Sequence, residues 1–209
     1  LVLTRGRFFD PTLPLPMEDV VVALQFGGRH ADISGRWQSN DRSYGQLDGR
    51  LDWAAEPQLA LKVTGERLPV SYEPYAHLEI EPDLDIAFRA GELSVTGEVA
   101  VPRGDIRVRE LPESAVRVSG DEMIVGVERP EPAVRSMPMD VTLVVGQDRV
   151  TFDAFGVTGD LEGTLRIGNN MDTRGVLQLV NGQYQEFGQD LALRRARIQF
   201  IGPLTEPYL

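Results

Sequence analysis

The sequence predicts an all-β fold, and three observations support that prediction. Apolar and polar residues alternate with a period of two along most of the chain, as in Leu47–Trp53. The 209 residues include 21 Gly and 14 Pro, so a residue that breaks helices occurs about once in six positions. The longest stretch free of both is Gln189–Ile201. This stretch is too short for a helical bundle, a coiled coil or a transmembrane helix.

Each predicted strand presents one apolar and one polar side, because successive side chains of a strand point in opposite directions. In chain order, the alternation predicts strands over 20–26, 47–53, 59–64, 84–88, 93–101, 106–108, 139–145, 161–167, 191–193 and 198–200, with a break at 194–196. Turn residues separate most of them, at 27–28, 39–41, 56–57, 104–105, 168–170 and 181–182. No helical pattern lies between the strands, which favours antiparallel neighbours.

The chain length fits one domain, and we expect a single unit over residues 1–209. Residues 109–138 combine four prolines with several acidic residues, which predicts a long, irregular and mobile excursion. The stretch Pro69–Pro82 predicts a second, weaker interruption. The chain starts without Met and stops within a strand-like pattern, so we expect it to be a piece of a longer protein.

Composition narrows the class of partner. The formal net charge is -11 at pH 7, which argues against nucleic acid because its binding needs a surface rich in Lys and Arg. The sequence has no Cys, which fits the cell envelope or a secreted protein, although bacterial cytosolic proteins also lack it. We therefore expect no nucleic-acid partner.

Motifs for catalysis and metal binding are scarce. The two histidines, His30 and His77, are the imidazoles available for a Ser-His-Asp triad, and neither lies near a nucleophile-elbow sequence. Structural zinc draws on several His or Cys residues in close spacing, which this chain lacks. We predict a protein that is not an enzyme and that has no metal and no cofactor.

The best acidic pattern is Glu79, Glu81, Asp83 and Asp85, which a spacing of two places on one side of a strand. A calcium site or a glycosidase carboxylate pair would use such residues, and a carbohydrate-active β-helix using Asp83 and Asp85 is the enzyme alternative. We favour a solvated outer face, because the opposite side of the same strand is consistently apolar.

The combined apolar side of the strands is the most informative feature. Roughly 40 side chains at ~50 Å² each give on the order of 2,000 Å², several times what a soluble monomer leaves exposed. Two stacked sheets or a closed barrel would cover this surface. A single curved sheet would instead leave a groove that holds lipid, detergent or another chain. Composition does not choose among these three arrangements.

Two segments resemble the C-terminal region of the TamB family. The first is Val101–Val108, followed by Leu111–Val116. The second runs from Asn181 through Phe187–Leu193 to a Phe-x-Gly-Pro-like turn at Phe200–Pro203. The resemblance covers residues 90–209, whereas residues 1–89 match as generic alternating strands.

The resemblance implies a long, curved, mostly antiparallel sheet that forms a taco-like groove with an apolar concave face. The family is similar to AsmA-like and bridge-like lipid transfer proteins. Its members are anchored in the inner membrane of Gram-negative bacteria, span the periplasm and meet the outer-membrane barrel TamA. The implied role is to conduct phospholipids between the two membranes and to support assembly of outer-membrane proteins, including autotransporters.

If this resemblance holds, phospholipid acyl chains would lie against the apolar side of the strands. The predicted lining residues are Val22, Leu24, Leu47, Leu51, Leu61, Val63, Ile86, Phe88, Leu93, Val95, Val99, Val101, Ile106, Val108, Val141, Leu143, Val145, Leu161, Leu165, Ile167, Leu191, Leu193, Ile198 and Phe200. The alternative is a scaffold or holdase whose open strand edges pair with unfolded outer-membrane protein strands. Isolated chains could also hide the apolar side by forming a homodimer.

Overall fold

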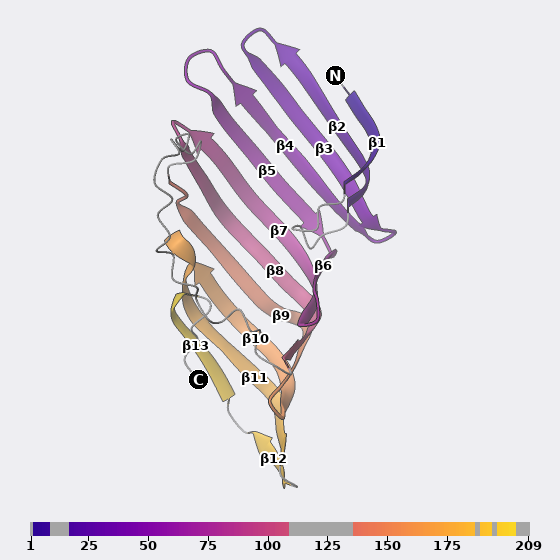
Figure 1. The fold of residues 1–209 in the computed structure, drawn as a ribbon, viewed down its shortest axis with the longest axis vertical. Helices are drawn as coiled ribbons and strands as arrows, with labels where there is room; N and C mark the ends of the chain where they lie inside the picture. The colour runs from indigo at the N-terminus through magenta and orange to yellow at the C-terminus, as the bar shows by residue number, and fades with distance from the viewer. Residues whose placement is uncertain (1, 9–16, 109–135, 187–188, 194–195, 204–209) are drawn as a thin grey trace, which may run out of the picture.

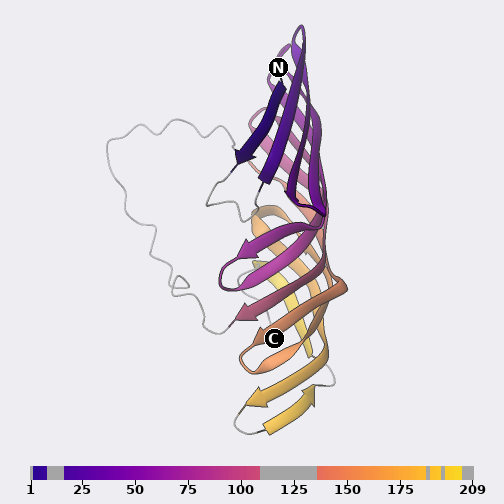
Figure 2. The ribbon, with the colours of Figure 1, turned by 90° about the vertical axis from the view of Figure 1, so that its right-hand side faces the viewer.

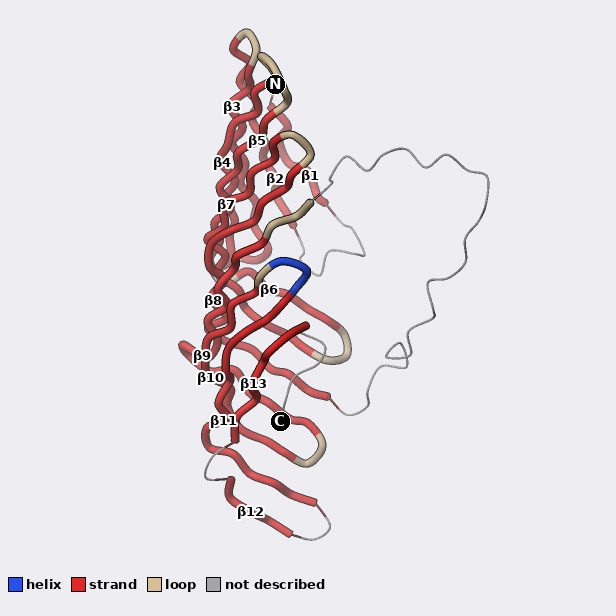
Figure 3. The backbone as a smooth tube through the Cα atoms, turned by 90° about the vertical axis from the view of Figure 1, so that its left-hand side faces the viewer, coloured by secondary structure: helices blue, strands red, loops and turns tan. Residues whose placement is uncertain are grey.

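The structure is a single open sheet, and the all-β prediction is confirmed. The computed structural model describes residues 2–8, 17–108, 136–186, 189–193 and 196–203. All its strands join one curved sheet of 13 strands (Figure 1). The described residues contain no α-helix, only one 3-10 turn at Asn169–Met171, which is the blue segment in Figure 3. No helix in the described part of the chain is long and apolar enough to cross a membrane.

The strands are long, and their bounds follow the alternating pattern of the sequence. They are β1 Val2–Phe8, β2 Met17–Gly27, β3 His30–Asn40, β4 Ser43–Asp52, β5 Gln58–Glu66, β6 Leu68–Tyr72, β7 Ala76–Arg89, β8 Glu92–Val108, β9 Met139–Ala154, β10 Val157–Ile167, β11 Asp172–Glu186, β12 Gln189–Leu193 and β13 Ala196–Pro203. Their order across the sheet is β1-β2-β3-β4-β5-β7-β8-β9-β10-β11-β12. β5 and β6 pair with successive stretches of the same edge of β7. In the same way, β13 and β12 pair with successive stretches of the same edge of β11.

One pair of neighbouring strands, β8 and β9, is parallel, whereas every other pair described is antiparallel. A parallel pair requires a connection that returns the chain to the end of the sheet where the first strand began. The segment between Val108 and Met139 makes this return. The irregular excursion predicted for residues 109–138 falls largely outside the described residues. At its described end, Ser136 forms a bridge to Glu92.

Two predicted turns are wrong, because the residues lie inside strands. Gly104–Asp105 lies within β8, where a Cβ on Gly104 would come within 2.6 Å of the His77 carbonyl oxygen. This glycine therefore permits close strand packing rather than a turn. Asn181–Gly182 lies within β11, where Asn181 has a φ of 53° and sits at a register shift against β10. A positive φ at one residue is typical of a bulge as well as of a turn.

The interruption predicted at Pro69–Pro82 is also mostly wrong, since it spans β6 and the first half of β7. Pro82 is buried inside β7 and pairs with Val99 of β8. On the other side of β7, the β5 ladder ends at Asp83 and the β6 ladder begins at Ile80. Pro82 thus occupies the gap between two ladders, where a residue without an N–H group leaves no hydrogen bond unmade.

A line of bulges crosses the middle of the sheet. The register shifts between Glu79 and Glu81 on β7, between Val101 and Arg103 on β8, and between Leu161 and Gly163 where β10 meets β9. A further shift follows between β10 and β11. Bulges bend a strand and increase its twist. In the edge-on view the sheet is one layer, and the strand ends of its C-terminal half curve to one side (Figure 2).

The buried core lies in the C-terminal half of the sheet. Its cluster comprises Val101, Val145, Val150, Leu161, Leu165, Leu177, Leu179 and Phe200. Strand curvature lets side chains of one face approach one another, which is how a single layer buries them. In the described residues before β8, by contrast, Ala31, Leu68 and Pro82 are the buried apolar side chains.

The location of this core predicts that truncating a buried leucine destabilises the protein far more than truncating an exposed isoleucine. Leu165 is 2% exposed, so Leu165→Ala removes buried methyl groups and leaves a cavity, at an expected cost of about 2–5 kcal/mol. Ile201, two strands away on β13, is 58% exposed, so Ile201→Ala should change the free energy of unfolding by less than about 0.5 kcal/mol. Urea unfolding followed by circular dichroism measures both. Equal effects would contradict the proposed location of the core.

Candidate functional site

Strand register defines one continuous apolar face. Residues paired in register project to the same side of a sheet. One row of paired residues therefore crosses the sheet from β2 to β13, and it reads Val22, Gly35, Leu47, Val63, Leu84, Gly97, Val141, Ile167, Thr173 and Gly202. Thr173 is the one polar residue in this row, and it is fully buried. We call this side of the sheet the apolar face.

All residues predicted to line a groove lie on the apolar face. A second row runs Leu24, Ile33, Gly49, Leu61, Ile86, Val95 and Met139, and a third runs Pro82, Val99, Leu143, Leu165, Gly175 and Phe200. The remaining predicted residues join parallel rows, for example Leu51 beside Leu59, and Leu193 beside Gly182. Their role in lining a groove stays a prediction.

Exposure of the apolar face differs between its two halves. In β8–β13, the predicted residues Val101, Val141, Val145, Leu161, Leu165 and Phe200 are buried. In β2–β7, the predicted residues are half-buried, including Leu47, Leu61 and Val63. Leu191, on β12, is 49% exposed. An open apolar surface is therefore found mainly before β8, whereas much of the C-terminal part is packed against itself.

An apolar cavity of about 490 Å³ lies beside that packed cluster, where the ends of β9 and β10 meet β12 and β13. Its lining includes Phe152, Val157, Leu193 and Ile198, with Arg197 as the charged residue among the described lining residues. Phe155, in the β9–β10 turn, also lines it and is 56% exposed. The cavity has the apolar lining that a hydrocarbon chain requires.

The opposite side, which we call the polar face, carries the acidic pattern found in the sequence. Register places Glu79, Glu81, Asp83 and Asp85 together on it. Lys62 of β5 contacts Asp83 and also lies 3.2 Å from Asp85, and the hydrogen bonds that its ammonium group donates to these two carboxylates raise the pKa of Lys62. Among the described residues, no group of His, Cys, Asp and Glu side chains is arranged to hold a metal ion. Asp83 and Asp85 are solvated, as we favoured for the whole pattern, whereas Glu79 and Glu81 are half-buried.

Two arginines also form ion pairs with aspartates on the polar face. Arg166 binds both carboxylate oxygens of Asp140 at 2.6 Å, and this hydrogen-bonded pair lowers the pKa of Asp140. Arg149 donates to Asp160 at 2.9 Å, and this hydrogen bond, with a second from Asn181, lowers the pKa of Asp160. Such exposed pairs add little stability but fix the positions of their side chains.

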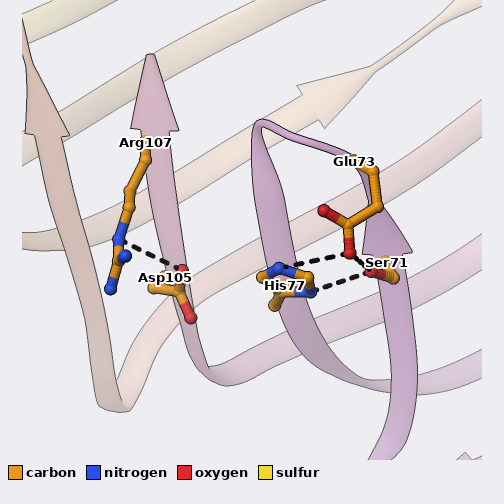
Figure 4. Close-up of polar contacts among 5 residues, drawn as sticks. All are labelled: Ser71, Glu73, His77, Asp105 and Arg107. Atoms are coloured by element: carbon orange, nitrogen blue, oxygen red, sulfur yellow. Dashed lines mark hydrogen bonds and ion pairs between the residues drawn. The ribbon is translucent and has the colours of Figure 1, made fainter. Parts of the chain in front are cut away.

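The structure also assembles a group that the sequence analysis missed. At the β6–β7 hairpin, Ser71 Oγ lies 2.8 Å from His77 Nδ1, and Glu73 Oε1 lies 3.5 Å from His77 Nε2 (Figure 4). The Ser71 hydroxyl also donates to the same Glu73 oxygen at 3.2 Å. In a catalytic triad the acid orients the base from the side away from the hydroxyl, without binding it. This exposed cluster therefore differs in geometry from a triad. Because register is set by tertiary pairing, sequence spacing alone did not reveal it.

The fold and its two faces define a class of protein: an open, single-layer β-sheet with one long apolar face and one charged face. A family model described as the TamB C-terminal domain matches residues 36–209. The chain therefore belongs to the TamB family. The match begins well before residue 90, so the family pattern extends further toward the N-terminus than the sequence resemblance indicated.

The chain is similar to the "Translocation and assembly module subunit TamB" of Haemophilus influenzae. The two are 29% identical over 216 residues, which cover 95% of this chain and 16% of the relative. The chain thus spans about a sixth of the length of the curated relative that it matches. No solved structure matches the chain.

The pKa shifts of Asp140 and Asp160 predict a specific loss of stability in acid. A carboxyl whose pKa is lower in the folded state contributes stability above its unfolded pKa of about 3.9 and loses that contribution as pH falls through the folded value. We expect Asp140→Asn and Asp160→Asn to flatten the fall of unfolding free energy between about pH 5 and about pH 2. Denaturant melts across that range provide the measurement.

Asp41→Asn is the matched control for this pH series. Asp41 lies in the β3–β4 turn, and none of the ion pairs described involves it. A pH profile flattened as much by this control as by Asp140→Asn would show that the two arginine pairs are not the cause.

Proposed function

We propose that the apolar face is the inner surface of a groove that conducts phospholipid acyl chains. The observation that supports this most is the row from Val22 to Gly202, which crosses ten strands with Thr173 as its one polar residue and is half-exposed in its N-terminal half. A soluble monomer seldom leaves so long an apolar surface uncovered unless it binds something. Membership of the TamB family is consistent with this proposal.

The proposed groove lowers a large solvation barrier. A phospholipid with two acyl chains has about 30 methylenes, and at ~0.8 kcal/mol each their exposure to water costs on the order of 24 kcal/mol. An apolar surface removes most of that cost without holding lipid more tightly than a bilayer does, since both surroundings are apolar. Transfer in this way needs no catalytic side chain.

We further propose that the chain works in the periplasm of a Gram-negative bacterium, as one part of an inner-membrane-anchored protein that acts with TamA. The relative's name, translocation and assembly module subunit, supports this assignment. In this arrangement the groove delivers phospholipid toward the outer membrane and supports assembly of outer-membrane proteins there. Its polar face remains in water.

A second function is favoured by the sheet edges. Among the described strands the sheet is open, and β1 at one end and β12 with β13 at the other each pair with a described strand on one side alone. An unpaired strand edge can add a strand from another chain through backbone hydrogen bonds. A holdase that receives unfolded outer-membrane protein strands would use these edges rather than the apolar face.

A charge placed on the apolar face tests conduction. Val63 is half-buried on this face in β5, so Val63→Asp should reduce phospholipid delivery in cells several-fold because an ionised group there opposes passing acyl chains. Ala60→Asp puts the same charge on the polar face of the same strand and should leave delivery unchanged. The measurement is lipid transfer between membranes at matched protein levels. Normal transfer in the Val63→Asp variant would contradict the groove. Leu165, another predicted lining residue, is unsuitable for this test because it is buried in the core.

Photo-crosslinking separates the two functions. A crosslinking residue at Leu61 or Leu93, both half-buried on the apolar face, should yield phospholipid adducts if lipid passes there. A crosslinking residue at Thr96, on the polar face of β8, is the control. Polypeptide adducts at Ile201 of the edge strand β13, with no lipid adduct at Leu61 and Leu93, would favour the holdase.

A further inference from the structure

A hollow of about 670 Å³ lies on the polar face, where β6, β7, β8 and β9 run side by side. Its lining includes three arginines, Arg103, Arg107 and Arg149, together with Ser71, His77 and Glu79. The strands bring these residues together across 79 positions of sequence, from Ser71 to Arg149. The hollow is separate from the apolar face, and the proposed lipid groove does not use it.

Strand pairing places like charges directly opposite each other in this hollow. Arg103 of β8 is in register with Arg149 of β9, and Glu79 of β7 is in register with Arg103. Like charges opposite each other across two strands are destabilising. Both arginines lie next to the line of bulges, and a bulge changes the direction in which nearby side chains project. Two guanidinium groups held together at some cost in stability suggest a role in binding.

Each of the three arginines is held from one side, which leaves further donors for a ligand. Arg149 binds Asp160 through Nε, Arg107 lies 3.6 Å from Asp105 through Nε, and Arg103 lies 3.5 Å from Asp148 through Nη2. Figure 4 shows the second of these pairs beside the His77 cluster. A guanidinium group has five N–H donors, and the hydrogen bonds described for Arg149 occupy Nε alone. The carboxylates therefore orient the arginines without using up their donors.

The carboxylate of Glu79 gives a second, independent observation. Its Oε2 atom is buried and has no hydrogen-bond partner among the described residues. An acceptor left without a donor in this way costs about 1–3 kcal/mol. A ligand that carries an N–H or O–H group next to its anionic group would supply the missing donor once the side chain turns toward it.

We propose that this hollow binds a phosphate ester whose organic part carries a hydroxyl or ammonium group. The phosphate accepts hydrogen bonds from Arg103 and Arg149, whose planar guanidinium groups match its oxygens, and Arg107 lies four residues beyond Arg103 on the same face of β8. The hydroxyl or ammonium group donates to Glu79. The source of this chemistry is either a free ester or the head group of a membrane lipid.

Titration calorimetry with sn-glycerol 3-phosphate at low ionic strength tests the site, using the purified protein. Arg103→Gln and Arg149→Gln should each weaken binding at least tenfold. Arg166→Gln is the matched control, because Arg166 is an exposed arginine of the same face that also pairs with an aspartate but lies outside the hollow. It should leave binding unchanged. Absence of binding to the unmodified protein, or equal loss in the control, would overturn the proposal.

The variant Glu79→Gln, measured with two phosphate ligands, tests whether a group of the ligand donates a hydrogen bond to Glu79. Glu79→Gln should weaken binding of sn-glycerol 3-phosphate relative to binding of inorganic phosphate, since a neutral amide replaces the charged acceptor of the ester's hydroxyl group. An equal effect on both probes would overturn the part assigned to Glu79. Circular dichroism of each variant should show the same folded β-sheet spectrum as the unmodified protein, so that a loss of binding is not a loss of fold.

Vesicles distinguish the two sources of the ester. Sedimentation with phosphatidylglycerol vesicles that depends on Arg103 and Arg149 would identify a lipid head group as the ligand. Calorimetric binding of the soluble ester with no vesicle binding would identify a free ester. A lipid-transfer assay on Arg149→Gln separates this proposal from the proposed function. Transfer along the apolar face should continue when the hollow no longer binds its ligand.

Discussion

Strand register is the constraint on which the rest of this structure depends. A slip of one residue between two strands would move every apolar side chain of one strand to the polar face. The sheet nevertheless contains several bulges, and those on β7, β8 and β10 lie in consecutive strand pairs. Val101 and Gly104 of β8 both face the apolar side, as do their partners Val145 and Val150 of β9. The bulges therefore bend the sheet without mixing its two faces.

The same line of bulges explains why the two halves of the apolar face differ. Beyond it the strands curve, their side chains meet, and a cluster around Leu161 and Leu165 becomes buried. Before it, β2–β5 remain flatter and their apolar side chains stay half-exposed. One sequence pattern thus produces a stable core at one end and an open apolar surface at the other. The proposed lipid path needs both, because a surface that is open along its whole length could not fold by itself.

Much of this fold is predictable from residue alternation, and the exceptions have physical causes. The strands around Leu47, Ile86 and Leu165 follow from strict alternation. The long β3 and β11 were not predicted, because glycine, serine and asparagine interrupt their apolar positions. The apolar face also follows from alternation, since period-two patterns specify faces directly. The Ser71–His77 cluster and the arginine hollow do not, because they depend on which strands become neighbours and in which register.

The parallel pair β8–β9 divides the chain into two antiparallel meanders, β1–β8 and β9–β13. The covalent connection between these meanders is the single segment that joins Val108 to Met139. A polypeptide cut there would become two chains, still joined by the ladder that runs from Val95 beside Met139 to Val108 beside Ala154. The hydrogen bonds between β8 and β9 and the apolar packing that the two meanders share would therefore hold the two pieces together after cleavage.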